Sequence, residues 1–493
     1  MDEKFKTIFI SLCRNFSVRY ILYTDIFQVL KNQGYRIILF FKDDSVEFYK
    51  ERFKDTDCIL EPVFFNEAFA ESRASFWARL FLVTRKCLSG ATEEMENSTD
   101  RMRLFQYEKQ MSKNLRGWLE FQIVRFWTAL GKRSHFVRTS LVALESFLFP
   151  GKMYDCYFKK YKPQMLIVSS VGYFIDPLFM RSAKRYQCKV ASIVHSWDNP
   201  STKDYRGAKT DHVIAWNELM KKEIEVFHDI PAEKIFVGGI AHWDFYFDGS
   251  FKPKSKVEFL KQYGLKEGRK LLFYGTSSHL IFRNTFDTIE MLLEKIRQGR
   301  FGDSVQLLVR LHPNYLLKQR KKEGQVLELF QERMDAFQKK YGDIIAFNIP
   351  KMTFLKSDVD MPLEDMRTLA ENLYHADVLL NEYSTLMIEA AIFDKPIINV
   401  GLHHYRDTEK PAWFLETFTH IKRILKTDCT KNAHTEEELL TAIDEYLKNP
   451  SLDREKRKRL VEQEAPTNRG SAGKKIGEHL VALIEKKELG KLL

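Results

Sequence analysis

The sequence lacks a membrane-spanning segment and the cysteine spacing of a disulfide or zinc framework. No window holds about 18 uninterrupted apolar residues, the length that a membrane-crossing helix needs. The six cysteines are scattered, without a CxxC pair or a histidine cluster at metal spacing, which predicts reduced thiols. The opening residues, MDEKFKTIFISLCR, do not follow the order of a signal peptide. We therefore expect a cytoplasmic protein.

The sequence also lacks the short motifs of several nucleotide- and nucleic-acid-binding classes. No GK[ST] completes a P-loop, and no RNP, KH or helix-turn-helix signature is visible, so we expect no nucleic acid partner. The formal charge of +11 favours anionic partners such as nucleotides, phosphorylated substrates or anionic lipid. An acidic DVD triplet at 358–360 follows no clear strand, and we expect no metal site there.

What the sequence does contain is a regular alternation of strand and helix patterns. The runs TIFISL and RIILFF flank a helical pattern, an order that predicts a parallel sheet. A polar segment at 248–256, DGSFKPKSK, predicts a linker. After it come further strand patterns, KLLFYGTSS, VQLLVRLHPN, DIIAFNI, ADVLLNEYS and KPIINVGL. We expect an α/β protein of two doubly wound, Rossmann-like domains with ligands at the carboxyl ends of the strands.

The expected domains are residues 1–250 and 251–465, with a C-terminal helix at 466–493 that packs back on the first domain. Residues 66–150 differ from their surroundings, because Arg, Lys, Phe and Trp recur there at helical spacing. We interpret them as a helical insertion in the first domain. Its helices suit either an anionic membrane surface and a lipid-linked acceptor, or a packed core with the arginines pointing outward.

Two strand-end loops of the second domain carry polar side chains that could bind a donor. In YGTSSH, Gly275 permits close approach of the backbone, and Thr276 and Ser277 supply hydrogen-bond donors. In VRLHPN, Arg310 and His312 leave the end of a strand and could hold phosphate. The alternatives are an ordinary strand-to-helix turn and a surface arginine beside a loop histidine.

A third polar turn of the second domain lies between a buried strand and a helix. It contains Glu382, Tyr383, Ser384 and Thr385, at a helix N-terminus that favours a diphosphate. Glu389, one turn further on, could reach the ribose of a nucleotide. Simple helix capping, with Glu389 in solvent, is the alternative.

The first domain offers histidines at strand ends. His195 is a candidate general base, since the ordinary pKa of histidine lies near 6.5, and Asp198 could orient it. Lys203 could meet a negative group. In GGIAHWD, Gly239 fits a tight turn and His242 is expected near the same site. Structural roles for both histidines remain open.

Taken together, these motifs resemble the GT-B glycosyltransferases over about residues 160–405. The closest resemblance is to the CDP-glycerol glycerophosphotransferases and related surface-polysaccharide transferases, with the UDP-N-acetylglucosamine 2-epimerases as neighbours. The matching positions are His195, the Arg-x-His-Pro element at Arg310 and His312, and the turn at 382–384, where Glu replaces the family's Asp. The resemblance implies a first domain on the acceptor side, a second domain that binds the nucleotide donor, and His195 as the base.

Two departures from that family favour a different donor. Ser196 and Trp197 follow His195 in place of Gly-Thr, and Glu389 stands where the family tends to have a Phe-Asp pair after the turn. They favour a glycosyltransferase that uses a nucleotide-sugar donor and a glycan or lipid-linked acceptor, at the inner face of the membrane, without metal or cofactor. The alternatives are a CDP-glycerol-type glycerophosphotransferase, a non-hydrolysing UDP-sugar 2-epimerase and a non-catalytic nucleotide or nucleic-acid binder.

Overall fold

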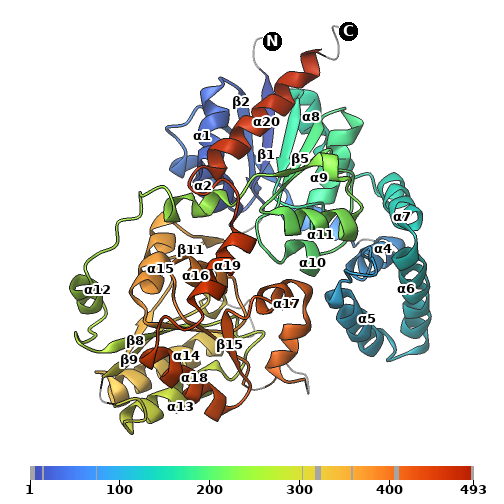
Figure 1. Cartoon of the computed structure of the whole chain (residues 1–493). Helices are drawn as coiled ribbons and strands as arrows, with labels where there is room; N and C mark the ends of the chain where they lie inside the picture. Colours follow the sequence, from blue (N-terminus) through green and yellow to red (C-terminus); the bar gives the residue numbers. More distant parts are fainter. Residues whose placement is uncertain are drawn as a thin grey trace. The chain divides into compact units, whose positions relative to one another are not determined.

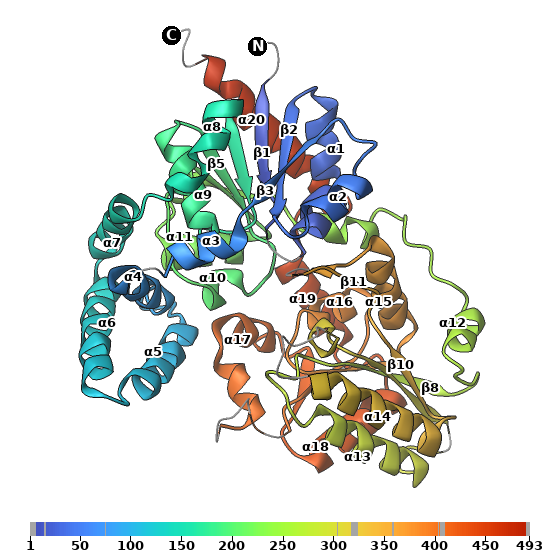
Figure 2. The same ribbon diagram turned by 180° about the vertical axis from the view of Figure 1, so that it is seen from behind.

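The chain forms two compact units (Figures 1 and 2). Unit 1 comprises Met1–Asp248, Thr353–Asp360 and Ala465–Leu493, and unit 2 comprises Gly249–Met352 and Met361–Glu464. The computed structural model describes residues 6–13, 16–73, 75–302, 304–316, 324–356, 359–402, 404 and 410–489. Within these ranges, no helix has the length and apolar character needed to cross a membrane.

Unit 1 is built on a sheet of seven parallel strands in the order β3-β2-β1-β4-β5-β6-β7. Their bounds are β1 Thr7–Ser11, β2 Arg36–Lys42, β3 Ile59–Val63, β4 Met165–Val168, β5 Lys189–Ile193, β6 His212–Ala215 and β7 Ile235–Val237. Ile8 and Ile10 belong to the core on one face of the sheet, and Phe9 belongs to the core on the other. Apolar side chains on both faces explain the continuous apolar strand runs in the sequence.

Helices cover both faces of this sheet. Their bounds are η1 Val18–Leu22, α1 Asp25–Asn32, α2 Val46–Arg52, η2 Lys152–Tyr154, α8 Asp155–Tyr161, α9 Asp176–Arg185, α10 Asn199–Thr202, α11 Glu218–His228, η3 Ala232–Lys234, η4 Ala241–Tyr246 and α20 Ala472–Leu489. The terminal helix α20 lies against α1, where a Cβ on Gly477 would come within 2.6 Å of Val29. Asp244 caps α20, since its carboxylate accepts hydrogen bonds from the N–H groups of Ala472 and Gly473 at 2.9 and 2.7 Å.

The insertion in unit 1 contains five helices, of which α4 to α7 pack together to one side of the sheet and α3 lies apart from them (Figures 1 and 2). These helices are α3 Phe65–Glu71, α4 Phe76–Lys86, α5 Ser98–Met111, α6 Leu115–Arg133 and α7 His135–Leu148. Side chains at the N-caps of α4 to α7 accept backbone hydrogen bonds, so each of these starts is encoded locally. The exposed large apolar side chains of α4 to α7 are Trp77, Phe105, Leu115, Trp118, Leu119, Ile123, Phe126, Trp127, Leu130, Phe136, Leu144, Phe147 and Leu148. Many apolar side chains of the insertion therefore face outward and are not part of a packed core.

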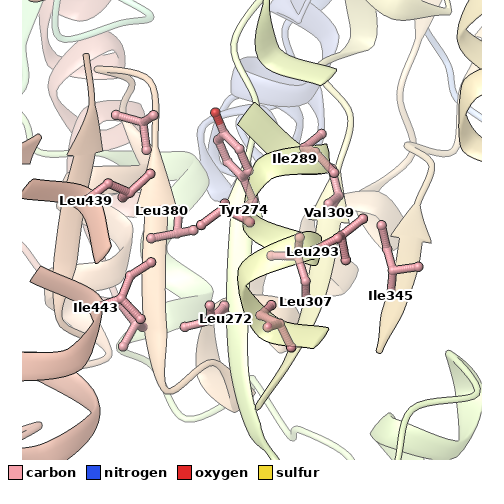
Figure 3. Packing of buried hydrophobic residues seen from close by; sticks show 14 of the residues in the cluster. Leu272, Tyr274, Ile289, Leu293, Leu307, Val309, Ile345, Leu380, Leu439 and Ile443 are labelled. Atoms are coloured by element: carbon pink, nitrogen blue, oxygen red, sulfur yellow. The ribbon is translucent and has the colours of Figure 1, made fainter. Parts of the chain in front are cut away.

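Unit 2 contains a six-stranded parallel sheet in the order β10-β9-β8-β13-β14-β15. The strands are β8 Lys270–Gly275, β9 Val305–Arg310, β10 Ile345–Asn348, β13 Val378–Asn381, β14 Ile397–Val400 and β15 Thr430–Ala433. The helices are α12 Lys256–Gln262, α13 Thr285–Arg297, η5 Pro313–Tyr315, α14 Gly324–Tyr341, α15 Leu363–His375, α16 Leu386–Ile392, η6 Ala412–Thr417, α17 Thr419–Leu425, α18 Glu436–Lys448 and α19 Arg454–Glu464. Figure 3 shows side chains of α13 and α18 packed on one face of this sheet. The two parallel sheets with their helices confirm the predicted α/β class.

A short hairpin of β11 Thr353–Phe354 and β12 Val359–Asp360 belongs to unit 1 although its neighbours in the sequence belong to unit 2. Asp360, the last residue of the DVD triplet, is buried and forms an ion pair with Arg52 of α2. Asp358 lies outside the described residues. Among the residues that the structure describes, no group of three or more His, Cys, Asp and Glu side chains could hold a metal ion.

Candidate functional site

The strand order of unit 2 places a topological switch point between β8 and β13. The chain proceeds outward from β8 to β9 and β10, and then returns to the other side of β8 with β13. Ligands of doubly wound sheets bind outside the carboxyl ends of the strands at such a point. Gly275 is in register with Arg310 on one side and with Asn381 on the other. The three polar loops expected from the sequence therefore begin at the same edge of the sheet.

Gly275 is required at this edge by packing. A Cβ there would lie 2.2 Å from Leu386 Cδ1, at the start of α16. The close approach expected at Gly275 is therefore an approach of α16, the helix that follows β13, to β8. This close packing of α16 on Gly275 places the turn after β13 next to the loop after β8.

Glu382 links these two loops from a buried position. Its Oε1 accepts hydrogen bonds from the hydroxyls of Tyr274 and Thr285, both at 2.8 Å, and its Oε2 accepts from the backbone N–H of Ser277 at 2.6 Å. The side chain is 2% exposed, and burial raises its pKa from 4.5 to about 7 despite the three donors. Glu382 thus positions the loop that contains Ser277.

We expect Glu382 to make the protein less stable as the pH rises from about 4.5 to about 7. Its pKa is higher in the folded state than in the unfolded chain, so the folded state holds the proton longer and stability falls with pH over this window. The change is on the order of 3 kcal/mol. The variant Glu382→Gln cannot titrate, and denaturant unfolding at several pH values should show a flatter profile across this window. An unchanged slope in the variant would contradict the raised pKa.

The turn after β13 is held by its own side chains. The Asn381 Oδ1 atom accepts from the N–H and the hydroxyl of Ser384, at 3.1 and 2.6 Å, and Asn381 Nδ2 donates to Asn399 on β14 at 2.8 Å. Tyr383 adopts a left-handed conformation with φ of 50°, and its hydroxyl donates to Glu416 at 2.6 Å. Thr385 stands at the N-cap of α16 without a side-chain capping bond. The capping alternative therefore does not apply to Thr385, which is half-buried, but the Ser384 hydroxyl accepts a hydrogen bond from the N–H of Leu386, the first residue of α16, at 3.3 Å.

Two predicted donor ligands prove to be buried within unit 2. Glu389 is 6% exposed on α16, so it is not a solvated helix residue. The guanidinium of Arg310 is paired with both carboxylate oxygens of Asp365 at 2.8 Å and donates to Asn348 as well. A direct contact of Arg310 with phosphate would require this buried pair to open. Its contacts instead make Arg310 a positioning group for the end of β9.

His312 links the loops after β8 and β9. Its backbone N–H donates to Thr276 Oγ1 at 2.9 Å, and its ring Nδ1 accepts from the N–H of Asn314 at 3.1 Å. Asn314 in turn donates from its side chain to Ser278 Oγ at 2.8 Å. Because Nδ1 is an acceptor here, the neutral ring carries its proton on Nε2.

Burial and neighbouring charges keep the His312 ring neutral. Burial, together with the smaller effects of the nearby His279 and Arg310, lowers its pKa to about 4. The His279 ring is tilted against that of Tyr315, with ring centroids 5.1 Å apart. His279 and Asn314 lie in the motifs YGTSSH and VRLHPN, but their contacts were not predictable from these motifs.

In unit 1, the structure brings the two predicted histidines together around one tyrosine. The ring centroid of Tyr20 lies 4.8 Å from that of His195 and 4.1 Å from that of His242. Trp216, at the end of β6, lies 5.6 Å from His242. Burial lowers the pKa of His242 well below its ordinary value, and Arg19 and His195 add to the effect. Tyr20 and Arg19 were not predictable as members of this group, because both occur in a stretch with ordinary helical spacing.

Asp198, Lys203 and Gly239 have identifiable structural contacts. The Asp198 carboxylate accepts hydrogen bonds from Ser196 and Thr202, each at 2.5 Å, and lies 3.9 Å from the Lys203 ammonium. Orientation of His195 by Asp198 stays a prediction. Gly239 has a φ of 92°, and a Cβ there would lie 2.5 Å from the carbonyl oxygen of Thr467. This glycine allows the chain before α20 to pack closely.

The fold and the polar strand ends define a GT-B protein. Solved structures with this fold include a glycosyltransferase from Rickettsia africae ESF-5, at 10% identity and a TM-score of 0.50 over 98% of each chain. An S. aureus MnaA–UDP structure matches at 11% identity and a TM-score of 0.51 over 97% of each chain. A UDP-N-acetylglucosamine 2-epimerase matches at 13% identity and a TM-score of 0.50, over 97% of this chain and 96% of the other.

The family of the chain is identified by a match between its sequence and a family model. The model of the family CDP-Glycerol:Poly(glycerophosphate) glycerophosphotransferase matches residues 93–342, which is more than half of the chain. The chain belongs to this family and is a transferase. No curated protein sequence matches it. The predicted resemblance to GT-B enzymes of the glycerophosphotransferase group is confirmed.

Proposed function

We propose that this transferase moves a glycerophosphate-type group from a cytidine diphosphate donor to a hydroxyl group of a surface polymer or its lipid-linked precursor. The observation that carries the proposal is the family match, because residues 93–342 include the loops of His195 and of Arg310 and His312. The net charge of +11 suits an anionic donor and a phosphate-rich acceptor.

In the proposed reaction, His195 of unit 1 accepts the proton of the acceptor hydroxyl. The hydroxyl oxygen forms a bond to the donor phosphorus that carries glycerol. The bond between that phosphorus and the oxygen bridging to cytidine monophosphate breaks, and cytidine monophosphate leaves with the electron pair. General base catalysis of this kind contributes about 10²–10⁴-fold to a rate.

The switch point of unit 2 is the proposed nucleotide site. Ser277, His312 and Thr385 are half-buried there, and they flank the loops that Glu382 holds together. The neutral His312 ring can donate from Nε2 to a phosphate oxygen. Thr385 can add a hydroxyl donor beside the start of α16. Arg310 does not contact the donor in this proposal; its ion pair with Asp365 positions the end of β9, from which the His312 loop begins.

A nucleotide-sugar donor is the second candidate, and Glu389 is the residue that favours it. The sequence-based preference for a sugar rested on Ser196 and Trp197 after His195, and on Glu382 and Glu389. The hydrogen bonds of Glu382 all lie within unit 2, so this residue can replace the family's aspartate without changing the donor. The departures at Glu389 and after His195 remain, but the family match makes the glycerophosphate donor the first choice.

Thermal unfolding with a panel of nucleotides tests the donor. We expect CDP-glycerol at about a hundred times its Kd to stabilise the protein by about 2.7 kcal/mol. CDP should stabilise it as well, whereas UDP, GDP and UDP-N-acetylglucosamine should have little effect at the same concentration. Release of cytidine monophosphate on addition of a polymer acceptor should accompany binding. Stabilisation by a UDP-sugar but not by CDP-glycerol would reverse the order of the two candidates.

A further inference from the structure

Unit 1 has a cavity of about 820 Å³ between the insertion and the sheet domain, away from the strand ends that carry His195. One wall is α7, which contributes Val142, Ala143 and Phe147. The other wall is formed by α9 and by the segments around Lys209 and Lys234. A volume of this size lies within the range of about 300–1,000 Å³ that is usual for small-molecule sites.

The cavity is built rigidly, because buried ion pairs anchor α7. The Arg138 guanidinium binds both carboxylate oxygens of Asp229 at 2.6 Å. Glu145 pairs with Arg85 of α4 at 2.8 Å and with Arg181 of α9 at 2.9 Å. These contacts hold the apolar side of α7 over the cavity and fix its inner wall.

The lining is strongly cationic. It includes six arginine and lysine side chains, against the single carboxylate of Asp229. Arg181, Lys184 and Arg185 are paired with carboxylates of Glu145, Asp211 and Asp155, respectively. Arg206, Lys209 and Lys234 are the further cations, and Arg206 Nε is buried without a hydrogen-bond partner among the described residues. The cavity therefore favours an anionic group.

The surroundings of the cavity point to a lipid as the source of that group. Phe147, which lines it, is 81% exposed, and Phe136 near the start of α7 is 71% exposed. Further tryptophan, phenylalanine and leucine side chains of α4 to α7 are exposed as well. Amphipathic helices with exposed aromatic residues and basic side chains bind at the interface of a membrane. A soluble anion would need no such apolar surroundings.

We propose that the cavity between α7 and α9 binds the phosphate headgroup of an anionic glycerophospholipid, while the exposed apolar side chains of the insertion enter the membrane surface. Arg206, Lys209 and Lys234 bind the phosphate, and Val142 and Phe147 contact the glycerol backbone and the first acyl carbons. This proposal is independent of the donor and of the reaction at His195. It assigns to the insertion a specific lipid site in addition to general attraction to a charged surface.

Sedimentation with vesicles tests the proposal on the full chain. We expect binding to phosphatidylcholine vesicles that contain phosphatidylglycerol, and little binding to phosphatidylcholine alone. The triple variant Arg206→Gln, Lys209→Gln and Lys234→Gln should weaken binding at least about tenfold, since each cation near an anionic surface contributes. The matched control Lys252→Gln, Lys261→Gln and Lys426→Gln removes the same charge from unit 2 and should retain binding.

A second variant distinguishes the contribution of the cavity to vesicle binding from the contribution of surface charge. Ala143→Trp fills the cavity from an exposed position on α7 without changing the charge, and it should also weaken binding to the anionic vesicles severalfold. Normal binding by Ala143→Trp would overturn the lipid site. Short-chain phosphatidylglycerol should raise the melting temperature of the wild type but not of Ala143→Trp. An equal rise with inorganic phosphate would identify a soluble anion site and overturn the assignment to lipid.

Discussion

Replacement of His195 by alanine should lower kcat by about 10²–10⁴-fold, the usual contribution of a general base. His195 follows β5, is 6% exposed, and lies against Tyr20 close to His242. Transfer is measured as release of the nucleoside monophosphate in the presence of acceptor. Nucleotide affinity, measured by thermal shift, should remain near that of the wild type, because the proposed donor site belongs to unit 2.

His212→Ala provides a matched control for this variant. His212 stands at the amino end of β6, the strand beside β5, and its removal should leave transfer within a fewfold of the wild type. Normal turnover by His195→Ala would exclude His195 as the base. A loss of both turnover and nucleotide affinity would instead indicate a structural role for this histidine.

His242 has a different expected role from its neighbour. Its pKa lies well below the ordinary value because of burial and because Arg19 and His195 are near, so it stays neutral throughout the working pH range. A neutral ring beside His195 does not oppose the positive charge that His195 gains with the proton. The surroundings of His242 therefore suit it to position Tyr20 and His195, and not to act as a second base.

The central strands and the edge strand β10 were predictable from the sequence, whereas the edge strands β3 and β15 were not. β8, β9 and β13 appear as apolar runs because both faces of the sheet are covered. β3 contains Glu61 and Pro62, and β15 has the polar sequence TKNA, so neither forms such a run. Both are edge strands of their sheets, where charged residues and proline are common. The hairpin of β11 and β12 was missed because each strand has only two residues.

The polar loops of the candidate site were also predictable, but the partners of their side chains were not. Arg310 and Glu382 were singled out because they follow apolar strands. Asp365, which pairs with Arg310, lies on a helix 55 positions further along the chain. The donors to Glu382 come from β8 and from the start of α13, about a hundred positions earlier. Motif spacing places a residue at a strand end, and only tertiary contacts show whether it faces a ligand or a neighbouring helix.

Replacement of Arg310 by methionine should destabilise unit 2 by about 3–5 kcal/mol, because it leaves the Asp365 carboxylate buried without its cation. Asp365 is 2% exposed, and apart from Arg310 it accepts a hydrogen bond from the N–H of Lys351 at 3.0 Å. Urea unfolding followed by circular dichroism measures the loss. A change of less than about 1 kcal/mol, the value typical of exposed pairs, would contradict a buried structural pair.

The double variant Arg310→Met and Asp365→Leu distinguishes two roles of Arg310, positioning the end of β9 and binding the donor phosphate directly. Apolar groups of similar volume often replace a buried ion pair without loss, so the double variant should recover at least about 2 kcal/mol relative to the single variant. If Arg310 only positions the end of β9, donor affinity should recover together with stability. If Arg310 binds phosphate directly, stability should recover while donor affinity stays low. The contacts of Arg310 with Asp365 and Asn348 favour the first outcome, in which the nucleotide is held by Ser277, His312 and Thr385.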